Sequence, residues 1–120
     1  PILIRPHPKR KYDLSGYIQQ PNVFESVKES TLDQDLAGAH ASVFYNSSSA
    51  VASILAGVPA FVSDEDAVTW EVSNHNINNI LTPDSPERSQ WLYDLAACHW
   101  SDSELLEGRV WEHFKPYLEV

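Results

Sequence analysis

The chain has 120 residues, and 42% of them are hydrophobic. It contains one cysteine and has a formal net charge of −9 at pH 7. This length and composition favour a single domain with a core, and the acidic excess argues against nucleic acid as the main partner. One cysteine cannot form an internal disulfide, and no apolar run approaches the roughly 18 residues of a membrane span. We therefore expect a cytoplasmic protein without a membrane span, and because the chain opens on Pro1 we expect a processed product or a piece of a longer protein.

The first element predicted is a short apolar strand at residues 2–4, which Pro6 and Pro8 end because proline cannot donate to a strand ladder. A basic, polar connection follows over residues 9–20. Half of the eight Lys and Arg residues fall within the seven positions 5–11, namely Arg5, Lys9, Arg10 and Lys11. One positive spot on an acidic chain fits a small anion better than a polymer, although residues 9–11 also read as a solvated loop.

His7 stands between two prolines, which stiffen the backbone around it. A rigid histidine at the end of a strand can donate to a phosphate oxygen or assist a leaving group, so His7 is the candidate catalytic residue. The alternative interpretation is a histidine that makes only structural hydrogen bonds. No spacing of histidines or cysteines matches a metal site, so we expect no metal and no cofactor.

The middle of the chain alternates strands and helices. Residues 22–25 predict a second short strand, residues 31–39 a helix, residues 41–45 a strand and residues 60–62 another strand. Between the last two, Asn46 precedes a helix that starts within Ser47–Ser49 and runs to Ala56. A hydroxyl-rich turn from strand to helix offers free backbone N–H groups and the positive end of the helix dipole, which suits phosphate. Plain helix capping is the alternative, but capping requires only one serine.

The last third is predicted to be mostly helical. Residues 66–74 predict a helix after the acidic run 64–66, and residues 80–81 predict a last short strand. Two more helices are expected over 86–100 and 101–117, the second opened by a capping box of Ser101 and Glu104. The alternation predicts an α/β fold, a Rossmann-like open parallel sheet with helices on both faces. Its core would cover residues 1–82, and the helical tail of residues 83–120 would pack on that core.

Two motifs resemble those of a known family. RPHP at residues 5–8 and DLAGAHASVFYNSSSAVASILAGVPAFV at residues 35–62 resemble the donor-binding, C-terminal half of GT-B-fold glycosyltransferases. The closest type is that of capsule-polysaccharide, CDP-glycerol and polysialic acid transferases, with a His-Pro motif at His7-Pro8 and a Ser-Ser motif at Ser48-Ser49. Many of these relatives carry a glutamate where this chain has Ala52.

The resemblance implies that the chain binds the phosphates of a nucleotide-activated sugar or polyol. Its ligand-binding residues would be Arg5, His7, Asn46 and Ser47–Ser49. GT-B enzymes have two halves, so an absent N-terminal half, a partner chain or a second copy would complete the site. A stand-alone, non-catalytic nucleotide or sugar-phosphate binding module and a GT-B-like nucleotide-sugar epimerase are the alternatives.

Overall fold

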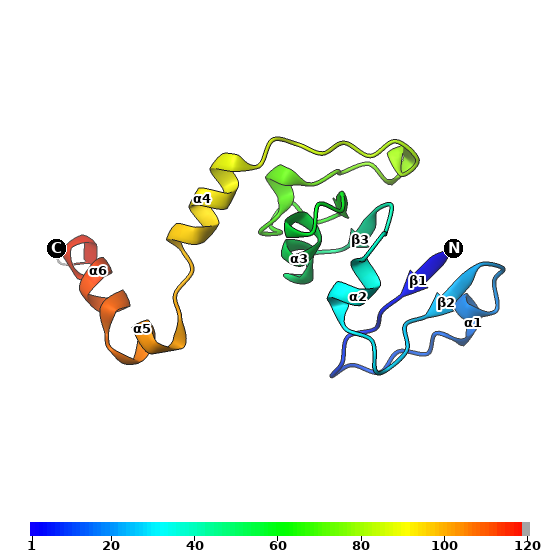
Figure 1. The fold of residues 1–120 in the computed structure, drawn as a ribbon, viewed down its shortest axis with the longest axis horizontal. Helices are drawn as coiled ribbons and strands as arrows, with labels where there is room; N and C mark the ends of the chain where they lie inside the picture. The colour runs from blue at the N-terminus through cyan, green and yellow to red at the C-terminus, as the bar shows by residue number, and fades with distance from the viewer. Residues whose placement is uncertain (119–120) are drawn as a thin grey trace. The chain divides into compact units, whose positions relative to one another are not determined.

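The structure is a computed structural model that describes residues 1–118, and the chain divides into two compact units, Pro1–Pro86 and Glu87–Val120. The first unit is mixed α/β and the second is helical (Figure 1). The elements of the first unit are β1 (Ile2–Ile4), α1 (Ser15–Ile18), β2 (Val23–Glu25), α2 (Leu32–Leu36), β3 (Ser42–Phe44), α3 (Ser49–Leu55), β4 (Ala60–Val62) and the 3₁₀ helices η1 (Trp70–Val72) and η2 (Ile77–Asn79). Those of the second unit are α4 (Ser89–Ala97), α5 (Asp102–Leu106) and α6 (Arg109–Leu118).

The four strands fall where the sequence predicted them, but they form two parallel sheets of two strands each. β1 pairs with β2, with Ile4 opposite Glu25, and β3 pairs with β4, with Phe44 opposite Val62. A single open sheet would require a strand of the first pair to hydrogen-bond to a strand of the second pair, and the described strands make no such pairing. The chain is therefore α/β with parallel pairing, and the prediction of one Rossmann-like sheet is not met.

Packing is uneven between the two sheets. All three residues of β4 are buried, and Val62 packs with Ala50 of α3 and with Ala67 in a cluster that Trp70 also covers. The sheet of β1 and β2 has little cover, since Ile2 is 62% and Phe24 56% exposed. Parallel sheets are usually buried on both faces, so the β1–β2 pair has less packing than such a sheet normally receives.

The segment after β4 differs from the predicted helix over residues 66–74. Only the 3₁₀ turn η1 forms, because Ser73 adopts an extended conformation and Asn74 bridges to Phe61 of β4. The backbone N–H of Asn74 donates to Ala60 O at 2.7 Å, and Val62 N–H donates to Asn74 O at 3.0 Å. Pairing with a buried strand thus replaces the last helical turn. The strand predicted at residues 80–81 is also wrong, since the 3₁₀ helix η2 and a turn occupy that region.

The C-terminal unit contains the predicted helices with changed limits. The helix predicted from Pro86 begins at Ser89, and the predicted capping box of Ser101 and Glu104 opens α5. The helix predicted over residues 101–117 is divided into α5 and α6, because Gly108 adopts a φ of 75°, which a right-handed helix does not contain.

Candidate functional site

A groove lies at the carboxyl ends of β1 and β2. Its volume is about 880 Å³, and its lining comes from the two segments that leave these strands: Arg5, Pro6, His7, Pro8, Arg10, Lys11 and Tyr12 after β1, and Glu25, Ser26, Val27 and Lys28 from β2. The groove therefore collects four of the eight Lys and Arg residues of an acidic chain. Ligands of parallel α/β sheets bind outside the carboxyl ends of the strands, which is where this positive charge lies.

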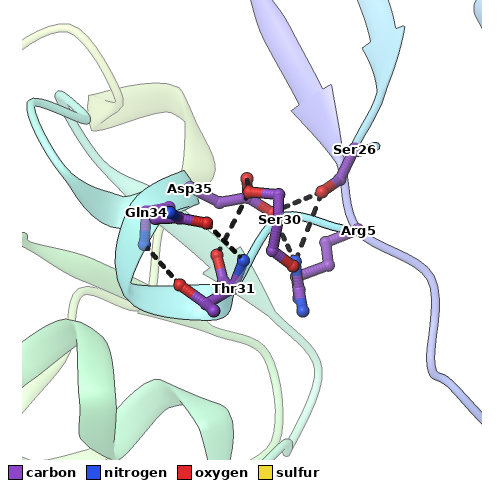
Figure 2. A network of polar contacts seen from close by, with 6 residues as sticks. All are labelled: Arg5, Ser26, Ser30, Thr31, Gln34 and Asp35. Atoms are coloured by element: carbon purple, nitrogen blue, oxygen red, sulfur yellow. Dashed lines mark hydrogen bonds and ion pairs between the residues drawn. The ribbon is translucent and has the colours of Figure 1, made fainter. Parts of the chain in front are cut away.

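Arg5 is held by a polar network at one side of the groove (Figure 2). Its Nη1 donates to Asp35 Oδ2 at 2.7 Å, to Ser30 O at 2.9 Å and to Ser26 Oγ at 3.3 Å. The two serine hydroxyls also donate to the carboxylate of Asp35, each at 2.5 Å. Hydrogen bonds from Ser26 and Ser30, followed by the one from Arg5, lower the pKa of Asp35 to about 2.

The first turn of α2 fixes the position of Asp35. Thr31 Oγ1 accepts a hydrogen bond from Gln34 N at 3.2 Å, and Gln34 Oε1 accepts one from Thr31 N at 2.8 Å. This reciprocal capping box satisfies two backbone donors at the start of the helix. Asp35 follows in the next position and faces Ser26, Ser30 and Arg5 in Figure 2. The network thus fastens α2 to the exits of β1 and β2.

His7 is exposed in the groove and its ring is oriented by its own backbone. Nδ1 accepts a hydrogen bond from Lys9 N at 3.1 Å, and Arg10 N donates to His7 O at 3.1 Å. An Nδ1 that accepts leaves the proton of the neutral ring on Nε2. His7 therefore presents Nε2–H as a donor that can bind an anionic oxygen.

Three further cations line the groove without a protein partner. Among residues 1–118, the side chains of Arg10, Lys11 and Lys28 make no hydrogen bond or ion pair. Lys28 and the neighbouring Ser26 were not singled out from the sequence. Their position in the sequence could have identified them, because both follow β2. If β2 is parallel to β1, the residues after the two strands lie at the same edge of the sheet.

The serine turn belongs to the other sheet. Ser48 is the N-cap of α3, which begins at Ser49 as predicted, and the cap bond comes from Ser47, whose Oγ accepts from Ser49 N at 3.1 Å. Asn46 donates from Nδ2 to Asp64 Oδ2 at 3.0 Å. The structure thus places Arg5 and His7 together in the groove, whereas Asn46 and Ser47–Ser49 follow β3 and do not line it.

Within residues 1–118, no three His, Cys, Asp or Glu side chains are grouped closely enough to hold a metal ion. No helix in the same range is both long and apolar enough to cross a membrane. Comparison of the chain with protein-family models, with curated proteins and with solved structures finds no match.

Proposed function

We propose that this chain binds the phosphates of a nucleotide-activated sugar or polyol and acts as the donor-binding half of a glycosyltransferase-like protein. The observation that carries the proposal is the groove, where His7 and three unpaired cations meet at the carboxyl edge of two parallel strands. Charge-assisted hydrogen bonds from lysine and arginine to phosphate are stronger than neutral ones. A small anion would therefore find here the densest positive charge of an otherwise acidic chain.

The roles of the groove residues follow from their geometry. His7 Nε2–H and the side chains of Arg10, Lys11 and Lys28 bind phosphate oxygens. Arg5 contacts Asp35, Ser26 and Ser30 through Nη1 alone, so Nη2 remains a donor toward a ligand. In the transferase reaction these donors would stabilise the negative charge that develops on the departing phosphate. His7 would act as the catalytic residue through a hydrogen bond from Nε2–H to the leaving oxygen, which stabilises the charge that develops there.

Asn46 and Ser47–Ser49 enter the proposal as a second set of donors at the carboxyl end of β3. Ser47 and Asn46 already have intramolecular partners. The hydroxyl of Ser48 is exposed and makes no hydrogen bond within the described residues, which leaves it available to a ligand. Asp64 beside Asn46 is a carboxylate that opposes an anion, so we expect this turn to contribute less than the groove.

Binding is tested by isothermal titration calorimetry with pyrophosphate, CMP, CDP, UMP, UDP and GDP. Lys28→Ala is expected to weaken binding about fivefold, the equivalent of about 1 kcal/mol for one charged contact at an exposed site. Lys9→Ala is the matched control, because Lys9 has the same charge and lies beside the groove without lining it. His7→Ala should weaken binding similarly, and Ser48→Ala less. Equal effects of Lys28→Ala and Lys9→Ala, or no binding by the wild type, would contradict the proposal.

Turnover is a separate expectation. His7 is exposed in an open groove, which neither excludes water nor orients a second substrate, and both are needed for a large rate gain. We therefore expect these 120 residues to bind a donor without hydrolysing it unless a second half or partner covers the groove. A donor-hydrolysis assay beside light scattering checks this, and clear turnover by a monomer would instead indicate a complete active site.

A further inference from the structure

Glu25 is an acidic residue in a groove whose other charged lining residues are basic. It is the last residue of β2 and lies opposite Ile4 of β1. Ile4 directly precedes the segment that carries Arg5 and His7. Among the lining residues it is the one carboxylate, and its side chain makes no ion pair or hydrogen bond with any residue in the described range 1–118. Its carboxylate is therefore an unused acceptor in a groove that unpaired cations also line.

A carboxylate that only repelled phosphate would weaken the function proposed above. An ionised carboxylate accepts hydrogen bonds and cannot donate them, so it is suited to hydroxyl groups. The groove also has more room than a diphosphate needs, since about 880 Å³ lies in the range of sites that take whole organic ligands. Pro6, Tyr12 and Val27 supply apolar lining for the body of such a ligand.

We propose that Glu25 accepts a hydrogen bond from a sugar hydroxyl of the bound ligand and thereby selects sugar-bearing phosphates over inorganic ones. This inference rests on the proposed phosphate site and assigns Glu25 as its specificity-determining residue. The two kinds of charge in the groove then have separate roles: the cations and His7 bind the phosphates, and Glu25 accepts a hydrogen bond from the sugar. The hydroxyl can belong to the ribose or to the transferred sugar, because both present the same donor.

The test compares four ligands by calorimetry on the wild type and on Glu25→Ala. Pyrophosphate carries no hydroxyl donor on a sugar, CDP carries the ribose hydroxyls, 2′,3′-dideoxy-CDP lacks them, and CDP-glucose adds a second sugar. In the wild type, the ligand whose hydroxyl meets Glu25 should bind about tenfold more tightly than the ligand without it, as expected for a hydrogen bond to a charged group. Glu25→Ala should abolish that preference. The same variant should bind pyrophosphate up to about twofold more tightly, because one repulsive charge is gone.

Glu29→Ala is the matched control, since it removes the same charge from a nearby exposed position that does not line the groove. If Glu25→Ala no longer binds CDP more tightly than dideoxy-CDP, the contact is with the ribose. If Glu25→Ala no longer binds CDP-glucose more tightly than CDP, the contact is with the transferred sugar. If Glu25→Ala keeps both wild-type preferences, or behaves as Glu29→Ala does, the role of Glu25 is refuted while phosphate binding stands. If the wild type binds neither pyrophosphate nor CDP, the proposed function fails and the role of Glu25 fails with it.

Discussion

Asn74 joins the chain after η1 both to β4 and to the segment that ends the first unit. The residue is buried, with 9% of its surface exposed, and its side chain donates from Nδ2 to Ala60 O at 3.3 Å and to Asp84 O at 2.8 Å. Its Oδ1 accepts from Asp84 N at 2.8 Å. Replacement by alanine removes all three bonds and leaves the backbone pairing of residue 74 with β4 possible.

The expected loss can be worked out bond by bond. A net intramolecular hydrogen bond contributes about 0.5–1.5 kcal/mol, and the contact at 3.3 Å belongs at the low end. Ala60 O keeps its bond from Asn74 N, and Asp84 is exposed enough for water to replace its lost partners. Asn74→Ala should therefore lower the free energy of unfolding of the first unit by about 2 kcal/mol.

Urea unfolding followed by the amide NMR signals of Phe61 and Val62 measures this change in the unit concerned. Asn79→Ala is the control, because Asn79 is exposed and its side chain makes no hydrogen bond within residues 1–118, and it should stay within about 0.5 kcal/mol of wild type. Asn74→Asp should cost at least as much as Asn74→Ala at pH 7, since a carboxylate would face two carbonyl oxygens. A free energy of unfolding for Asn74→Ala that matches Asn79→Ala would refute the reasoning.

Three more outcomes are expected. Thr69→Val should leave stability unchanged or raise it by up to about 1 kcal/mol in urea unfolding, because the buried Oγ1 of Thr69 has no hydrogen-bond partner among the described residues; a clear loss would show that the hydroxyl is satisfied. The pKa of Asp35 is lowered to about 2, so its carboxylate contributes stability that is present above the ordinary pKa of 3.8 and is lost as pH falls toward 2. In a measurement of the free energy of unfolding against pH, Asp35→Asn should remove this loss of stability at low pH, and Asp33→Asn should keep it. No atom lies within 4 Å of a Cβ added at Gly57 or at Gly16, so backbone conformation decides the effect of alanine at both positions. Gly57→Ala should lower the free energy of unfolding by about 1 kcal/mol because φ is +76° there, whereas Gly16→Ala within α1 should raise it. Thermal unfolding that ranks the two variants the other way would contradict this.

Local signals predicted the elements whose structure depends on neighbouring residues. The hydroxyl run before α3, the prolines after β1 and the capping box of Ser101 and Glu104 act over three or four residues, and each gave the correct boundary. The helix predicted over residues 66–74 failed because Asn74 pairs with Ala60 and Val62, contacts that lie more than ten positions away. Hydrophobic periodicity describes only neighbouring residues, so it cannot indicate a strand pairing with residues that far away in the sequence.

The candidate site could be predicted in part for the same reason. Arg5 and His7 stand next to a strand and were identifiable from the sequence, but Lys28 and Glu25 belong to the site only through the register of β1 with β2. Asp35, which lies thirty residues from Arg5, could not be assigned as its partner before α2 was placed. Ligand binding by Arg5 stays a prediction, and the structure adds a structural role for its Nη1.

The thin cover of β1 and β2 has a consequence for how binding can be observed. These strands make three paired positions and expose most of their apolar side chains, so the groove is built on a segment with little local stability of its own. A ligand that binds only the ordered segment stabilises it by RT ln(1 + [L]/Kd), about 2.7 kcal/mol at a hundredfold excess over Kd. Occupancy of the groove should then appear first as slower amide hydrogen exchange at residues 2–4 and 23–25, before any change in the exchange of β4.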